Sequence, residues 1–334
     1  SLDNKTITIN PSDNLSALTN YKIMVTTGLK DQAGNQLQTE WPSSQEGFST
    51  APPSGIRMWL DASNVNGLYN IGLSDGENIS EWKDLSGNGN HGVQDTLSNK
   101  PNYDSDGFNG KPSVEFNGSS DYMDINTTLV SQKSFSIFIV QVSMITGNQN
   151  LIGKHTSNGV NELMMGWWRG KWYFNLNHDG ESMPTPTGSP SFFITDKTIV
   201  QYEYRNAGGS TFVTGKINGY TYKLDHKYPT TVPTSGSGLK WTIGQDWDSG
   251  PVESNFLEGD ISEIMLIEGE LTESEEISVR CYLSSKWGLT DSVDCDGDGV
   301  VDASDPITTT RWRLIAKQDD VVNYKFSSNA KNNG

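Results

Sequence analysis

Short runs of apolar or alternating residues recur through the middle of the chain, and they predict β-strands. β-Branched and aromatic residues are frequent in these runs, and turn-forming residues separate them. Asn218-Gly219, between two of the runs, is typical of a two-residue hairpin turn. The runs are IRMWLDA, PSVEFNG, SFSIFIVQVS, ELMMGWW, KWYFNLN, TIVQYEYRN, TFVTGKING, YTYKLD, LKWTIGQ and DISEIMLIEG. Their density predicts an antiparallel β-sandwich.

One segment has the pattern of a helix, and it follows the last of these runs. The helix is predicted to begin at Leu271, because Thr272 and Glu275 have the spacing of a capping box. Gly288 is suited to the position just after the helix end. Apolar contacts would come from Ile277, Val279, Tyr282 and Leu283. The predicted fold is therefore all-β with one C-terminal helix.

Changes in pattern divide the chain into four segments. Residues 1–50 contain three predicted strands and end at Pro52-Pro53, a short, stiff boundary. Residues 54–290 form the main β domain. Residues 291–310 form an acidic linker. Residues 311–334 hold two further strand-like runs, RWRLIAK and VVNYKF, and are the start of another module or a tail.

The charge of the chain narrows the range of partners. Its 334 residues carry a formal net charge of −17, which disfavours nucleic acid and anionic membranes and attracts divalent cations. The sequence has no apolar run of about 18 residues, so membrane insertion is not expected. The first residues, SLDNKTITIN, lack the pattern of a signal peptide, and the abrupt start suggests a piece of a longer protein.

The most specific chemical motif is DCDGDGVVDASD at residues 294–305, which has the spacing of an EF-hand-type calcium loop. Alternate side chains of such a loop point inward and supply oxygen ligands, while Gly299 permits the sharp turn. The predicted ligands of Ca²⁺ are the side chains of Asp294, Asp296, Asp298, Asp302 and Asp305 and the carbonyl of Val300. An acidic, solvated segment without metal is the alternative. Calcium in this loop would be structural.

The chain has two cysteines, Cys281 and Cys295, which are 14 positions apart. A disulfide between them would join the predicted helix to the calcium loop, and an extracellular location would suit both features. Two unrelated free thiols are the alternative.

Residues 1–50 resemble the C-terminal half of a bacterial Ig-like domain. The matching pieces are LSALTNY at 15–21, KDQAGN at 30–35 and Phe48-Ser49-Thr50. The first half of that family's domain has no counterpart here. The resemblance therefore implies a half-sandwich with an open edge, to be completed by preceding polypeptide or by another chain.

The main domain resembles the laminin-G and concanavalin A-like jelly rolls of large bacterial extracellular proteins. The matching pieces, in the family's order, are WLDASNVNG, WKDLSGNGNHG, KPSVEFNGSSDYM, GDISEIMLIEGELTESE and YLSSKWGL. The acidic loop at 294–305 resembles thrombospondin type 3 repeats and dockerin loops. These resemblances imply a jelly-roll fold and calcium, and much less about function, because such domains include lectins, adhesion modules and fillers.

A second calcium site is implied by a resemblance to pentraxins, which share the jelly roll. The segment IGQDWDSG at 243–250 is similar to the pentraxin segment that binds calcium, through which the ligand is bridged. The resemblance assigns carboxylates to Asp246 and Asp248 and a backbone carbonyl to Trp247. Glu253 or Glu258, and Asn148 with Asn150, are candidates for the remaining ligands. An acidic surface turn is the alternative.

The string EGDISE, with Glu258, Asp260 and Glu263, resembles the catalytic pattern of laminarinase-type β-glucanases. Two glutamates on one strand face would then act as nucleophile and acid/base across a sugar. The helix that ends the domain follows this strand at once, whereas those enzymes carry the motif on a mid-domain cleft strand. We therefore expect no catalytic residues in this chain.

Tryptophan side chains are the candidates for stacking on sugar rings. Trp247, Trp167 and Trp172 are predicted to contact ligand, although each also fits a core position. Alternation along the strand places Trp167 and Trp168 on opposite faces, so at least one belongs to the core.

Together these features predict a non-catalytic recognition or adhesion module of a secreted or surface protein that binds glycan or a cell-surface ligand and is rigidified by calcium. Neighbouring domains of the same polypeptide are further expected partners. One alternative is a structural subunit that forms a homopolymer or surface layer, by strand exchange through the incomplete Ig-like unit. The other is a laminarinase-type glycoside hydrolase.

Overall fold

The computed structural model divides into two compact units, residues 53–305 and residues 1–52 with 306–334. It describes residues 20–21, 48–49, 55–125, 134–155, 161–175, 191–207, 209–228, 241–248, 252–297 and 299–304. In the second of these units, β1 (Asn20–Tyr21) pairs antiparallel with β2 (Phe48–Ser49). The rest of the predicted Ig-like segment and the predicted module or tail at 311–334 lie outside the described residues.

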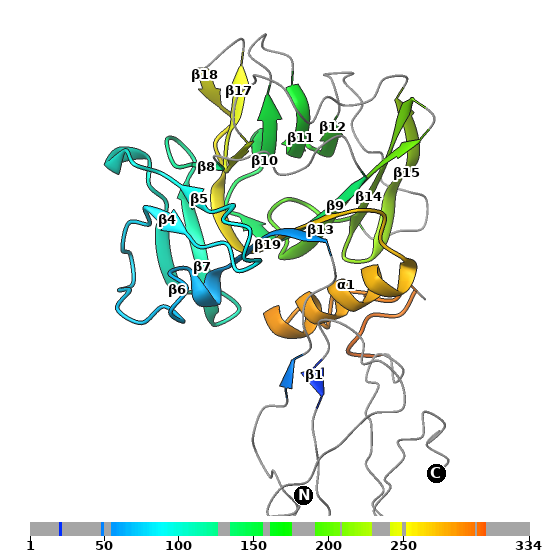
Figure 1. Ribbon diagram of the computed structural model, residues 1–334, viewed down its shortest axis with the longest axis horizontal. Helices are drawn as coiled ribbons and strands as arrows, with labels where there is room; N and C mark the ends of the chain where they lie inside the picture. Colours follow the sequence, from blue (N-terminus) through cyan, green and yellow to red (C-terminus); the bar gives the residue numbers. More distant parts are fainter. Residues whose placement is uncertain are drawn as a thin grey trace, which may run out of the picture. The chain divides into compact units, whose positions relative to one another are not determined.

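Residues 53–305 form a sandwich of two antiparallel sheets (Figure 1). The first sheet has seven strands, in the order β12-β11-β10-β16-β8-β5-β4. Their bounds are β4 Glu81–Trp82, β5 Gly92–Val93, β8 Met123–Ile125, β10 Gln149–His155, β11 Asn161–Trp168, β12 Lys171–Asn175 and β16 Trp241–Ile243.

The second sheet has eight strands, in the order β15-β14-β13-β9-β19-β7-β6, with β3 paired to β19 outside this path. Its long central strands, β9 and β19, are almost entirely buried, as expected for strands that are covered on both faces. The bounds are β3 Ile56–Asp61, β6 Asn102–Phe108, β7 Lys111–Asn117, β9 Phe135–Ser143, β13 Thr198–Ala207, β14 Ser210–Ile217, β15 Tyr220–Tyr228 and β19 Glu258–Glu268.

Aromatic side chains join the two sheets in the core. Phe174 of β12 stacks on Tyr202 of β13 with ring centroids 4.8 Å apart. Phe135 of β9 lies edge-on to Trp241 of β16 at 6.3 Å. Each pair has one ring from each sheet, so these contacts fix the spacing of the layers.

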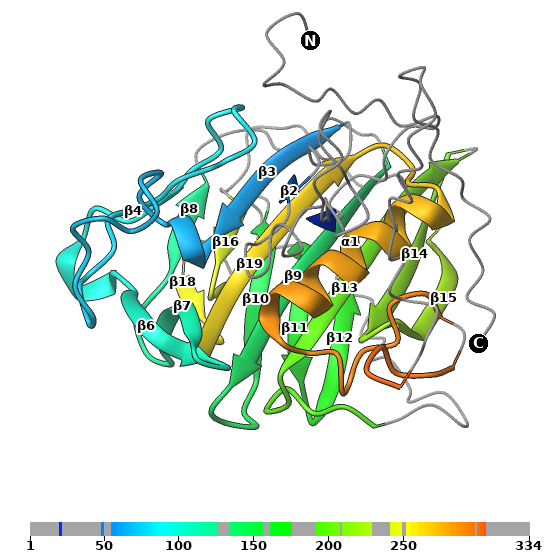
Figure 2. The same ribbon diagram turned by 90° about the horizontal axis from the view of Figure 1, so that it is seen from below.

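A single described α-helix, α1 (Glu273–Trp287), lies along the outer face of the second sheet, over β9 and β13 (Figure 2). Thr272 caps it, and the Thr272–Glu275 capping box forms. Gly288 ends the helix in the left-handed conformation at φ +66°. The helix starts two residues after the predicted Leu271, and no described helix is long and apolar enough to cross a membrane.

Three short elements complete the unit. A small hairpin, β17 (Asp246–Asp248) with β18 (Val252–Ser254), follows β16. Two 3₁₀ turns, η1 (Ala62–Asn64) and η2 (Leu97–Asn99), follow β3 and precede β6. The predicted turn at Asn218-Gly219 joins β14 to β15, with both residues at positive φ.

The predicted fold class is confirmed: two antiparallel sheets and one C-terminal helix make an all-β sandwich. The finer assignment to a laminin-G-like family stays a prediction.

Candidate functional site

The β17–β18 hairpin lies next to a buried polar cluster in which one side chain has no partner. Gln245, just before β17, is fully buried. Within the described part of the chain, neither its Oε1 nor its Nε2 takes part in a hydrogen bond. A buried amide left without partners costs about 1–3 kcal/mol, so this side chain is suited to meet a bound polar group.

The backbone around Gln245 is held firmly by neighbouring strands. Asn150 of β10 donates from Nδ2 to the carbonyl of Gln245 at 2.9 Å, and Thr242 donates from Oγ1 to the same carbonyl at 3.1 Å. The Oδ1 of Asn150 accepts from the backbone N–H of Met165 at 3.2 Å. These contacts tie the cluster to β10, β11 and β16, which makes it a preformed part of the fold.

Asp246, the first predicted ligand in this segment, is also buried and accepts from Asn255 Nδ2 at 3.4 Å. The register pairs Trp247 with Glu253 and Asp248 with Val252. The side chains of Trp247 and Asp248 lie outside the described residues, so the full set of oxygens predicted for this calcium site is not assembled here. No group of three or more His, Cys, Asp or Glu residues suited to a metal forms among the described residues.

The acidic loop at 294–305 folds onto the sandwich. Asp294 is buried, and its two carboxylate oxygens accept from the backbone N–H groups of Gly297 and Gly299, both at 2.8 Å. Asp302 accepts from the N–H of Cys295 at 2.8 Å and from the hydroxyl of Ser284 on α1. The loop is thus drawn around its first and ninth positions.

The remaining predicted ligands of this loop are only partly described. Asp296 is half-buried and Val300 is exposed, while Asp298 and Asp305 lie outside the described residues. Burial raises the pKa of Asp302, against its hydrogen bonds with Ser284 and Cys295, and the charges of Asp294 and Asp296 raise it further. Carboxylates that repel one another in this way are suited to a divalent cation.

The predicted disulfide forms: Cys281 of α1 is bonded to Cys295, with Cα atoms 5.0 Å apart. Two further contacts seat the segment that was expected to be a linker. Arg280 Nε donates to the carbonyl of Cys295 at 2.8 Å, and Asp294 N donates to the carbonyl of Asn218 at 3.0 Å. A side chain at Gly219 would collide with the Asp294 carbonyl, so the β14–β15 turn and the loop fit closely.

The structure does not bring Glu258 and Glu263 together as a catalytic pair. Glu263 is fully buried and its carboxylate is occupied by donors from Trp59, Tyr282, Lys286 and Trp287. Burial raises the pKa of Glu263. Glu258 is half-buried, and its backbone N–H donates to Gln149 at 2.9 Å. Asp260 is buried and accepts from Ser113 of β7 at 2.6 Å.

Two predicted sugar-contacting tryptophans lie in the interior. Trp167 and Trp172 are 4% and 3% exposed and pack edge-to-face with ring centroids 5.5 Å apart. Trp172 donates its indole N–H to the carbonyl of Phe192 at 2.9 Å. Since neither ring offers a face to solvent, the structure does not support their assignment as ligand-contacting residues.

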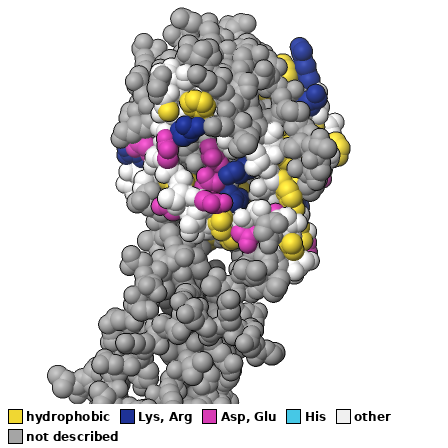
Figure 3. Space-filling view, turned by 90° about the vertical axis from the view of Figure 1, so that its right-hand side faces the viewer, with side chains coloured by type: hydrophobic (Ala, Val, Ile, Leu, Met, Phe, Trp, Pro, Cys, Tyr) yellow, Lys and Arg dark blue, Asp and Glu magenta, His cyan; other side chains and the backbone are white. Residues whose placement is uncertain are grey.

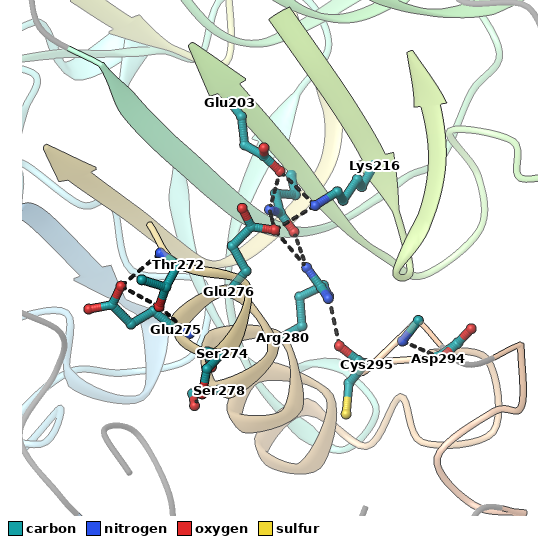
Figure 4. A network of polar contacts seen from close by, with 12 residues as sticks. Glu203, Lys216, Thr272, Ser274, Glu275, Glu276, Ser278, Arg280, Asp294 and Cys295 are labelled. Carbon is teal, nitrogen blue, oxygen red and sulfur yellow. Dashed lines mark hydrogen bonds and ion pairs between the residues drawn. The ribbon is translucent and has the colours of Figure 1, made fainter. Parts of the chain in front are cut away.

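A polar network between α1 and the second sheet was not expected from the sequence. Lys216 contacts both Glu203 and Glu276, and Arg280 reaches Glu276 at 3.3 Å and Gln201 at 3.0 Å (Figure 4). The four-residue spacing of Glu276 and Arg280 is the one sequence signal that could have shown it. A pocket of about 370 Å³ beside the network includes Glu203, Glu276 and the exposed Glu270. Figure 3 shows acidic and basic side chains interleaved on this side of the molecule.

Comparisons with known proteins show the fold of the sandwich. Similar structures include a Trypanosoma rangeli sialidase mutant with trans-sialidase activity (14% identity, TM-score 0.46, covering 72% of this chain and 34% of that one). Domain 4 of an extracellular arabinanase from Geobacillus stearothermophilus, in complex with arabinotriose, is 18% identical (TM-score 0.38, 66% and 95% coverage). The CBM40 of the Ruminococcus gnavus IT-sialidase, bound to α2,3-sialyllactose, is 14% identical (TM-score 0.41, 50% and 95% coverage).

The chain spans about a third of the length of the sialidase that it matches. No curated protein matches the chain. One family is matched by sequence, and it covers only the segment before the sandwich: residues 1–50 match the family described as Bacterial Ig-like domain.

Proposed function

We propose that residues 53–305 form a non-catalytic recognition module that binds glycan at the β17–β18 rim, in a secreted or surface-exposed bacterial protein. The observation that carries the proposal is the buried amide of Gln245, which has no partner in the described part of the chain and adjoins the carboxylate of Asp246. Sugars are rich in hydroxyl groups that both donate and accept, which is the chemistry that such an amide and carboxylate require.

Calcium is the second part of the proposal. In the loop at 294–305 it would be held by the acidic side chains and would stabilise the contact between α1 and the sandwich. At the rim, Asp246 with Asp248 and the carbonyl of Trp247 would hold a second Ca²⁺ whose open positions accept sugar hydroxyls. The support is the acidic spacing of both segments and the preformed backbone around Asp294 and Gln245.

The matched bacterial Ig-like family at residues 1–50 and the disulfide support a location outside the cell. A glucanase is disfavoured because the carboxylate of Glu263 is buried under α1 and occupied by four donors. Detectable hydrolysis of laminarin that is lost in Glu258→Gln would overturn the non-catalytic assignment.

The test is a glycan array probed with the whole chain in calcium and in chelator, followed by calorimetry of any hit. Gln245→Ala and Asp246→Asn should weaken binding at least tenfold, because each removes a group that the ligand or its calcium contacts. Glu270→Gln, at the pocket beside α1, is the matched control and should bind like the parent chain. Binding that survives both rim substitutions would show that the site lies elsewhere.

A further inference from the structure

Lys286, in the last turn of α1, lies between two carboxylates in a nearly closed site. Its Nζ is 2.6 Å from Asp61 Oδ2 and 2.7 Å from Glu263 Oε2. The side chains of Lys286, Asp61 and Glu263 are 19%, 8% and 0% exposed. An amine and a carboxyl group are thus held in contact where water is scarce.

Aromatic side chains form much of the wall of this site. The indole N–H groups of Trp59 and Trp287 each donate to Glu263 at 2.6 Å, and the hydroxyl of Tyr282 donates at 3.1 Å. Trp287 is fully buried. Such a surrounding solvates charge poorly, so it favours neutral forms of the amine and the acids over the ion pair.

The charges of the cluster do not balance. One amine faces two carboxylates, and among the described residues no second basic side chain contacts either acid. Burial acts to lower the pKa of Lys286, although the two carboxylates outweigh it and hold that pKa above its usual value. Burial also raises the pKa of Glu263. A proton shared within the cluster is therefore expected, with Glu263 as one of its holders.

The carboxyl group of Asp61 is polarised for attack. Its Oδ1 accepts from the backbone N–H and the hydroxyl of Ser63, at 2.8 Å and 2.7 Å. Two donors on one oxygen stabilise the negative charge that would develop there in a tetrahedral intermediate. The other oxygen, Oδ2, faces Lys286 and is the one that would leave.

We propose that Lys286 and Asp61 become joined by an intramolecular isopeptide bond, with Glu263 as the proton carrier. Neutral Lys286 attacks the Cγ of protonated Asp61, and a C–N bond forms while the oxyanion rests on Oδ1. Glu263 accepts the proton released from nitrogen and passes it to Oδ2, which departs with its own proton as water. The products are one amide, one water molecule and Glu263 in its starting state, so no oxidant or co-reactant is needed. The neutral pair is the minor form, but each reaction is irreversible in this dry site, so the linked form accumulates.

Lys216 provides an internal comparison. It also contacts two carboxylates, Glu203 and Glu276, and its side chain is 18% exposed. There Arg280 adds a second positive charge that contacts Glu276, and no aromatic donors surround the acids. Both acids are then stabilised as anions, so Lys216 is expected to remain a free amine.

The bond would join residues that are 225 positions apart in the sequence. It would connect the end of the first strand of the sandwich, β3, to the last turn of α1, and nearly the whole domain would lie within the closed loop. Together with the Cys281–Cys295 disulfide it would anchor α1 covalently at both the strand and the loop side.

The test is mass spectrometry of the intact chain after disulfide reduction. The inference predicts a mass lower than the sequence by one water molecule. Because cyclisation of an aspartate elsewhere gives the same loss, the bond must be located by tryptic digestion. The predicted product is a branched peptide of residues 58–83 and 281–311, in which the bond after Lys286 is not cleaved.

Lys286→Arg keeps the charge but removes the nucleophile, and it should have the full sequence mass. Glu263→Gln should slow or abolish the water loss. Cleavage after Lys216 should proceed in every variant. An intact parent chain of full mass, with free 58–83 and normal cleavage after Lys286, would overturn the inference whether or not the variants fold.

Discussion

Replacing Glu263 by glutamine tests whether the cluster under α1 stabilises the sandwich. In the parent chain, two carboxylate oxygens accept from four donors: two indoles, one phenol and the Lys286 ammonium. Glutamine has one acceptor oxygen, and its amide group is a donor that would face other donors. Breaking a buried ion pair in this way costs about 3–5 kcal/mol. For a unit of this size that is a drop in melting temperature of roughly 6–20 °C.

Glu268→Gln on the same strand is the matched control. Its partner Arg57 has a side chain that is 41% exposed, and pairs that reach solvent contribute about 0–1 kcal/mol. Thermal and urea unfolding, followed by tryptophan fluorescence, would measure both variants. The magnitude counts non-covalent contacts alone, so a covalent link between Lys286 and Asp61 would enlarge it. If Glu263→Gln unfolds within about 1 kcal/mol of the parent chain, the reasoning about this cluster fails.

Three further outcomes are expected. Burial raises the pKa of Asp260 and of Asp121 to about 6, so both groups stabilise the folded state below about pH 4 and this contribution is lost as pH rises through about 6; unfolding titrations should show stability falling over that window, by roughly 3 kcal/mol less in Asp260→Asn. Reduction of the Cys281–Cys295 disulfide, which closes a 14-residue separation, should cost about 3 kcal/mol in denaturant, whereas an equal midpoint in reductant would contradict this. Chelator should lower the melting temperature of the parent chain but not of Asp294→Ala, and an unchanged parent melt would exclude structural calcium in the loop.

Local signals in the sequence were enough to predict several elements. The caps of α1 were readable because Thr272, Glu275 and Gly288 act within one turn of the helix. The β14–β15 hairpin was readable because Asn218-Gly219 tolerates positive φ at both positions. The disulfide was predicted from two cysteines alone, since the short separation left few other partners.

Features that depend on distant contacts could not be read in this way. Trp167 and Trp172 are direct cross-strand partners of β11 and β12, so both rings lie on the same sheet face, and the same interior covers them. The string EGDISE gives no sign that Glu263 will meet Lys286 of α1 and a tryptophan from β3. The orphan amide of Gln245 likewise depends on which groups three other strands bring to it.

The measurement that tests the account most directly is calorimetry of a glycan hit with the parent chain and with Gln245→Ala, in calcium and in chelator. The account predicts binding by the parent chain in calcium, at least tenfold weaker binding in chelator, and a similar loss in Gln245→Ala with an unchanged melting temperature. Glycan binding of equal affinity in all of these conditions, or no binding to any glycan in calcium, would contradict recognition at the β17–β18 rim.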